Sequence, residues 1–122
     1  MSYGVTMNTT PEIELPGDNY LQDLGSYAGL EFLETIEADN QSVLYNMVAW
    51  SGMDGEDPDP FSPDEVLTEV EKVLALLETD PAAAQFDNVF SKADFTECLQ
   101  ELRKNLIAAQ SAGVTQVELI YA

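Results

Sequence analysis

Two segments, one near each end of the chain, alternate hydrophobic and polar residues in the manner of β-strands. They cover residues 3–7 and residues 114–121. Each would place three hydrophobic side chains on one face, namely Tyr3, Val5 and Met7 in the first and Val117, Leu119 and Tyr121 in the second. We expect these two strands to pair in one small sheet. A short edge strand over Glu12–Leu15, between two prolines, is a further expectation.

Between these segments, hydrophobic residues recur every three or four positions, as they do on one face of an α-helix. The spacing predicts a helix that starts at Asn19 with Asp18 as its N-cap. Its hydrophobic stripe would comprise Leu21, Leu24, Ala28, Phe32 and Ile36. A shorter helix around residues 43–48 would be capped by Asn40 or Ser42.

The tetrapeptide Ser-Pro-Asp-Glu at residues 62–65 predicts the start of a third helix. Ser62 fits the N-cap, Pro63 fits the first helical position, and Glu65 completes a capping box. The predicted stripe of this helix is Val66, Leu67, Val70, Val73, Leu74 and Leu77.

The last long helix would bury Phe95, Cys98, Leu99, Leu102, Leu106 and Ala109 and end at Gly113. Its Glu101 and Lys104, three residues apart, are expected to pair. These patterns together predict an α+β fold in a single domain over residues 1–122. That domain would be helix-dominated, with four to five helices and a small sheet formed by the N- and C-terminal strands.

Negative charge is concentrated in the first two-thirds of the chain. The formal net charge is −19 at pH 7, from 23 acidic and four basic residues. Residues 1–80 hold 18 acids and one base, which gives −17, whereas residues 81–122 hold five acids and three bases, which gives −2. Such a charge favours solubility and association with cations. It argues against direct binding to nucleic acid or anionic lipid, because both require Lys and Arg.

Residue types that catalysis and metal binding commonly use are scarce. Histidine is absent, which removes the usual base for a Ser or Cys nucleophile and the commonest zinc ligand. Cys98 lies on a hydrophobic stripe, where a buried thiol is expected. We therefore expect no enzymatic activity and no cofactor. The absence of a long apolar run, and of any Lys or Arg before Lys72, predicts a cytoplasmic protein of bacterial or phage type with no membrane contact.

The candidate binding residues are acids around the start of the third helix. Four of them, Asp54, Glu56, Asp57 and Asp59, lie in a proline-containing loop whose spacing does not match an EF-hand. On the helix, Asp64, Glu71 and Glu78 would line one flank of the stripe, and Glu65 and Glu69 the other. Phe61 is a candidate aromatic anchor, or else a residue that packs next to the Ser62 cap.

These features predict an acidic protein that binds another protein. It would be an inhibitor or antidote, of the immunity or nucleic-acid-mimic type, that covers a basic surface on a nuclease, toxin or nucleic-acid-binding protein. Two alternatives remain open at this point. One is a domain whose acidic surface is merely solvated, and the other is a small ligand-binding protein or enzyme with an unrecognised carboxylate site.

Overall fold

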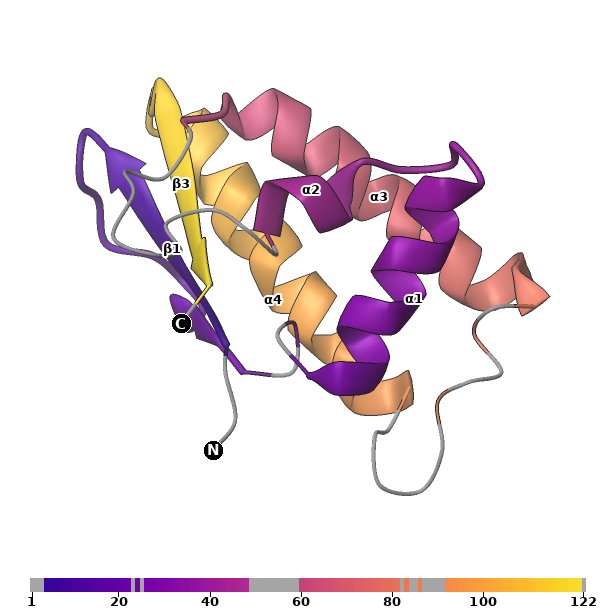
Figure 1. Ribbon diagram of the computed structural model, residues 1–122. Coiled ribbons are helices and arrows are strands. Elements are labelled where there is room, and N and C mark those ends of the chain that lie inside the picture. The colour runs from indigo at the N-terminus through magenta and orange to yellow at the C-terminus, as the bar shows by residue number, and fades with distance from the viewer. Residues whose placement is uncertain are drawn as a thin grey trace.

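The computed structural model describes residues 4–22, 24, 26–48, 60–81, 83, 86 and 92–121. Within these residues the chain forms four helices and three strands (Figure 1). In chain order they are β1 (Val5–Thr10), β2 (Tyr20–Leu21), α1 (Tyr27–Ala38), α2 (Leu44–Val48), α3 (Pro63–Thr79), α4 (Lys92–Ser111) and β3 (Gln116–Tyr121). The fold is helix-dominated α+β, as the sequence predicts.

The strands form one antiparallel sheet in the order β2-β1-β3. The two strands from the ends of the chain lie side by side, with Val5 opposite Tyr121 at one end of the pair and Thr10 opposite Gln116 at the other. This confirms the predicted pairing of the N- and C-terminal strands. Pairing this distant in sequence brings residues 5–10 next to residues 116–121 and gives the helices a sheet to pack against.

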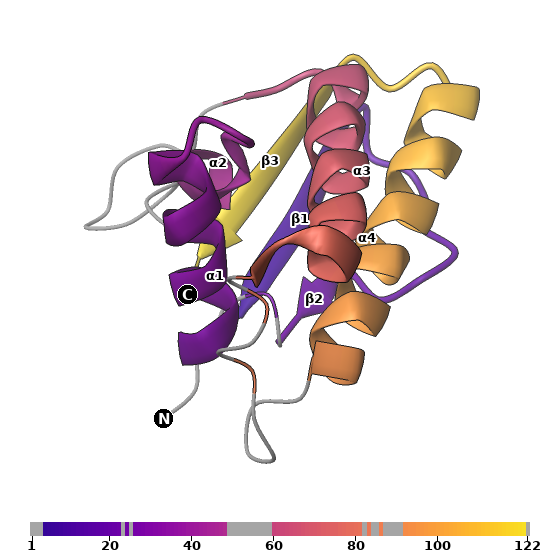
Figure 2. The same ribbon diagram turned by 90° about the vertical axis from the view of Figure 1, so that its right-hand side faces the viewer.

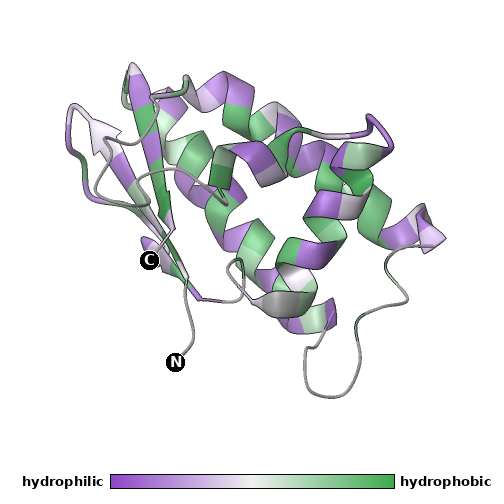
Figure 3. Ribbon diagram, in the orientation of Figure 1, coloured by the Kyte–Doolittle hydropathy of each residue, from purple (hydrophilic) through white to green (hydrophobic). Residues whose placement is uncertain are grey.

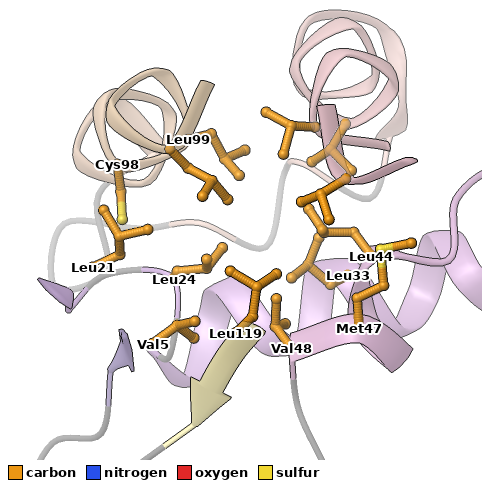
Figure 4. Close-up of a cluster of buried hydrophobic side chains, with 14 of the residues drawn as sticks. Val5, Leu21, Leu24, Leu33, Leu44, Met47, Val48, Cys98, Leu99 and Leu119 are labelled. Carbon is orange, nitrogen blue, oxygen red and sulfur yellow. The ribbon is translucent and has the colours of Figure 1, made fainter. Parts of the chain in front are cut away.

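The helices cover one face of the sheet (Figure 2). Hydrophobic and hydrophilic residues alternate along each element (Figure 3), as expected of elements with one buried face. Figure 4 shows the core where the elements meet, with side chains from the sheet and the helices pointing toward one another. Val5 and Leu119 come from the sheet, Leu33 from α1, Leu44 from α2 and Leu99 from α4, and all five are fully buried.

The first helix starts later than the sequence predicts. Leu21 lies in strand β2 and Leu24 precedes the helix, so the expectation of a helix from Asn19 was wrong. Leu21 and Leu24 are both buried although neither lies in the helix. Their three-residue spacing therefore reflects burial alone and is not evidence of a helix. The true N-cap is Ser26, whose hydroxyl oxygen accepts a hydrogen bond of 3.1 Å from the Gly29 backbone N–H.

Gly29 also lies where α1 approaches α4. A side chain at this position would begin 2.7 Å from the ring of Phe95, so only glycine permits the observed packing. At the far end of α4, Gly113 has a φ of 76°, a left-handed conformation that glycine adopts without strain. This confirms Gly113 as the residue that ends the helix.

The segment between β1 and β2 is tied to α4, and its last residue, Asn19, also accepts a hydrogen bond of 2.8 Å from the Met7 N–H of β1. The expected edge strand over Glu12–Leu15 does not form. The fully buried Asn105 accepts a hydrogen bond from the Gly17 N–H (2.8 Å) and donates one to the Asp18 carbonyl (2.8 Å). These two bonds tie an irregular stretch of backbone to the helix surface, a role that sequence reasoning missed.

Glu101 lies one turn before Asn105 and turns toward the same segment. Its Oε2 atom is buried next to Gly17 and has no hydrogen-bond partner among the described residues. The expected Glu101–Lys104 pair is therefore wrong. Packing against the loop holds the carboxylate away from the outer face of the helix, where Lys104 is exposed.

Candidate interaction surface

Helix α3 begins at the predicted capping box. The Ser62 hydroxyl accepts a hydrogen bond of 3.1 Å from the Glu65 N–H, and the Glu65 carboxylate accepts one of 3.5 Å from the Ser62 N–H. Phe61, immediately before the cap, exchanges two backbone hydrogen bonds of 2.9 and 2.7 Å with Val117 of β3. Its half-buried side chain packs against the core, so the structure gives Phe61 a structural role. Together these contacts fix the start of α3 against the sheet.

Four of the predicted acids lie exposed along α3. They are Asp64, Glu65, Glu71 and Glu78. At a rise of about 1.5 Å per residue they extend over roughly 20 Å of helix. None of them forms an ion pair with any of the chain's four cations. Asp64 accepts a hydrogen bond of 2.5 Å from the Gln110 side chain of α4, and the other three face solvent apart from the capping contact of Glu65.

Glu69 does not belong to this exposed row, which corrects the sequence prediction. Only 7% of the residue is exposed, and it lies among the buried side chains of α3. Its carboxylate accepts hydrogen bonds from the Val43 N–H (2.8 Å) and the Ser42 hydroxyl (3.1 Å), which hold the start of α2. Its other oxygen, Oε2, accepts a hydrogen bond from Lys72 at 2.9 Å. Glu69 is therefore a structural residue, and it also forms an ion pair with Lys72, the one cation on α3.

The environment of Glu69 keeps its carboxylate ionised. Burial alone raises the pKa of a carboxyl group, because it disfavours the charged form. The Lys72 ammonium, the Val43 N–H and the Ser42 hydroxyl more than offset burial and hold the pKa of Glu69 below its ordinary value of 4.5. A buried charge of this kind is tolerated because each oxygen has a donor.

The acidic loop before α3 is not part of the described chain. Asp54, Glu56, Asp57 and Asp59 all lie outside the described residues. The contribution of these four acids to a binding surface stays a prediction from the sequence.

Acids outside α3 are exposed as well. On α1 they are Glu31 and Glu34, and in the segment between β1 and β2 they are Glu12 and Glu14. The negative surface of the first 80 residues therefore extends over several elements. Helix α3 is the described element that holds the longest series of exposed acids at regular spacing.

Sequence reasoning missed a hollow of about 520 Å³ between α3 and α4. It is lined by Leu74, Gln100, Arg103, Lys104 and Ile107. Leu74 was expected inside the stripe of α3 but lies half-buried at its border, and Ile107 is 38% exposed. One signal was present in the sequence, because Ile107 falls outside the predicted stripe of α4 while two cations lie within about one turn of it.

The described part of the chain lacks both a group of metal ligands and a membrane-spanning helix. No three His, Cys, Asp or Glu residues lie together in a group that could hold a metal ion. No helix in that part has the length and the apolar composition that crossing a bilayer requires.

Comparison with known proteins adds no identification, because no family model, curated protein or solved structure matches this chain. The residues and their geometry therefore carry the functional argument.

Proposed function

We propose that this protein is an acidic binding protein that covers a basic surface of another protein. In its most specific form, the partner is a nuclease, toxin or nucleic-acid-binding protein, and this chain acts as its inhibitor or antidote. The proposal rests chiefly on one observation. Helix α3 presents Asp64, Glu65, Glu71 and Glu78 to solvent without an intramolecular cation to neutralise them.

The support from α3 is both electrostatic and geometric. Carboxylates at fixed positions on a capped helix lose little conformational freedom on binding, because their backbone is already ordered. A surface of one charge sign raises the association rate with an oppositely charged partner, toward about 10⁸ M⁻¹s⁻¹ at low salt. Lys72 contributes little opposing charge to this surface because Glu69 holds it.

The chemistry of the partner follows from the same charges. Polyanions such as nucleic acid and anionic lipid are repelled by a molecule of net charge −19. A groove rich in Lys and Arg, of the kind that binds a phosphate backbone, is the complementary surface. Acids on several turns of one helix suit such a groove better than isolated acids do.

The test compares two charge reversals of equal size. Glu71→Lys with Glu78→Lys changes the row on α3, and Glu31→Lys with Glu34→Lys changes the same number of exposed acids on α1. The wild-type protein is exposed at low salt to a cell lysate that contains nucleases or toxins. The basic proteins that it retains are identified by mass spectrometry. Each is then purified, and its affinity for the three proteins is measured by calorimetry at several salt concentrations.

We expect the α3 variant to weaken binding at least tenfold and the α1 variant to weaken it much less, since loss of one close charge pair costs about 1.5 kcal/mol or more. Affinity should fall as salt rises. Retention of no basic protein, or equal weakening by both variants, would contradict the proposal. Equal weakening would instead support a surface whose charge serves only solvation.

A further inference from the structure

Helices α3 and α4 form a pair whose outer side, the side away from the sheet, is exposed. Residues of the two helices can be matched by their height along this pair. The helices lie side by side and run in opposite directions, as the colours show in Figure 2. The hydrogen bond between Asp64, near the start of α3, and Gln110, near the end of α4, marks one common level. Because the helices are antiparallel, equal steps forward along α3 and backward along α4 keep the same level. By this count Glu71 lies level with Arg103, and Leu67 lies level with Ile107.

The two helices border this outer side with different kinds of residue. The flank of α3 that faces α4 alternates acids with half-buried leucines: Asp64, Leu67, Glu71, Leu74 and Glu78. The flank of α4 that faces α3 has as its central residues Gln100, Arg103, Lys104, Ile107 and Gln110, and the exposed acid nearest to it, Glu97, lies two turns before Lys104. One flank is therefore acidic and apolar, and the other is basic and apolar.

A two-fold axis that runs parallel to the helices makes such a surface complementary to itself. The rotation places α3 of one copy over α4 of the other and leaves every residue at its own level. Glu71 of one copy then faces Arg103 and Lys104 of the other, and Leu67 faces Ile107. The symmetry repeats both contacts. A two-fold axis perpendicular to the helices would instead lay the acidic flank of α3 on itself.

The cations of this side have no partner within the described chain. The side chains of Arg103 and Lys104 are exposed and make no ion pair or hydrogen bond with another described residue. They are also two of only four cations in a molecule with 23 acids. Although Glu71 lies level with Arg103, the two side chains form no ion pair in the structure. A surface that complements Arg103, Lys104 and Ile107 must offer an acidic side chain next to an apolar one. The α3 flank offers this combination in Glu71 and Leu67.

We propose that a second copy of this chain docks on this side, forming a two-fold dimer in which the two α3–α4 pairs face each other across the hollow. Two-fold contacts of one patch with itself are the commonest form of association in soluble homo-oligomers. The inference does not depend on the proposed function, because it concerns the purified protein alone. It has one consequence for that function: Glu71 is used in the dimer, so a basic partner and the second copy compete for α3.

The dimer forms against a long-range repulsion, because each copy carries a net charge of −19. The contact must therefore depend on the local pairs between Glu71 and the two cations and on the apolar contact of Leu67 with Ile107. Reversal of either half of the charge pair should therefore weaken association at least tenfold. This makes the charge pair the most informative target for an experiment.

The experiment uses sedimentation equilibrium of the full chain over the micromolar range, in about 0.15 M salt, where charges are screened beyond about 8 Å. The first variant is Glu71→Lys, and the second combines Arg103→Glu with Lys104→Glu. The control is Glu34→Lys, which reverses an exposed acid on α1 and changes the net charge as much as the first variant does. All variants change exposed side chains, and circular dichroism verifies that each one is folded.

We expect the wild type and the control to dimerise, and each of the two variants alone to bind itself at least tenfold more weakly. An equimolar mixture of the two variants should associate again. In the mixed dimer, the lysine that replaces Glu71 in one copy would meet the two acids introduced on α4 of the other. The native Glu71 of that other copy would meet the native Arg103 and Lys104.

If the variants failed to associate because they were misfolded, mixing them would not restore association. Restored association in the mixture therefore shows that the charge pair forms the contact. A wild type that stays monomeric, variants that dimerise normally, or a mixture that does not associate would each overturn the proposal.

Discussion

Helices α3 and α4 are built alike on the inside and differ on the outside. Each buries a hydrophobic stripe, and each uses one buried polar side chain to hold a distant segment of chain. On α3 that residue is Glu69, which holds the start of α2 through Val43. On α4 it is Asn105, which holds the segment between β1 and β2 through Gly17.

The exposed faces of α3 and α4 differ in charge. On α3 the acids Glu71 and Glu78 form no ion pair with a cation of their own chain. On α4 acids such as Glu97 share the surface with Arg103 and Lys104. Since the same kind of interior is compatible with both surfaces, packing does not require the acidic excess. The comparison separates residues that hold the fold from residues that are free to bind, and the following changes test that separation.

The largest effect is expected from Asn105→Ala. It removes two hydrogen bonds and leaves the Gly17 N–H and the Asp18 carbonyl without the amide that holds them, which should lower the free energy of unfolding by about 2–4 kcal/mol. Urea denaturation measures the change. The matched control on the same helix is Gln100→Ala, an exposed position where a change within about 0.5 kcal/mol is expected. Equal losses in the two variants would show that Asn105 does not hold the segment.

The next effect is expected from Glu69→Gln. The amide can still accept from Val43, but it places a donor next to Lys72, and the free energy of unfolding should fall by about 1–2 kcal/mol at neutral pH. Urea denaturation again measures the change. The control is Glu78→Gln, an exposed position on the same helix that takes no part in the charge pair proposed for the dimer, with a change within about 0.5 kcal/mol.

The Glu69→Gln effect should also depend on pH. The pKa of Glu69 in the folded protein lies below 4.5, so its ionised form contributes stability that is fully present above pH 4.5. That contribution is lost as the pH falls through the folded pKa, because the unfolded state takes up the proton first. Urea curves at a series of pH values should therefore show the gap between wild type and Glu69→Gln narrowing below pH 4.5. A gap that is constant with pH would contradict the role assigned to the carboxylate.

A smaller effect is expected from Ser62→Ala at the start of α3. Loss of the capping hydrogen bond to the Glu65 N–H should lower the free energy of unfolding by about 1 kcal/mol. The matched control is Ser111→Ala at the exposed end of α4, which should change stability by less than about 0.5 kcal/mol. If the two changes are equal, the capping box adds nothing beyond what the packed face of α3 supplies.

Local signals accounted for the parts of the fold that depend on neighbouring residues. The capping box at Ser62 and the left-handed Gly113 involve only residues within a few positions of each other, and both were predicted from the sequence. The false helix start at Asn19 shows the limit of periodicity. Leu21 and Leu24 are buried at helical spacing, yet a strand and a turn bury them equally well.

The residues of the candidate site also fall into two groups, those whose exposure the sequence predicts and those whose placement depends on distant parts of the chain. Exposure of Glu71 and Glu78 follows from their position on the flank of the hydrophobic stripe, which the sequence shows. Burial of Glu69 does not, because it depends on Ser42 and Val43, 27 and 26 residues earlier in the chain. The hollow beside Leu74 depends on how far α4 lies from α3, which no local pattern encodes.

By itself the sequence determined the α+β class, the pairing of its terminal strands, the start of α3 and the excess of exposed acids. It could do so because hydrophobic periodicity and capping act over one or two helical turns, and because the two terminal strand patterns each need a partner to form a sheet. Only the tertiary structure decided which acid turns inward, which amide anchors a distant loop, and that two cations and two apolar side chains border one hollow. Those outcomes are set by contacts between segments far apart in the chain, whose geometry exists only once the helices have packed on the sheet.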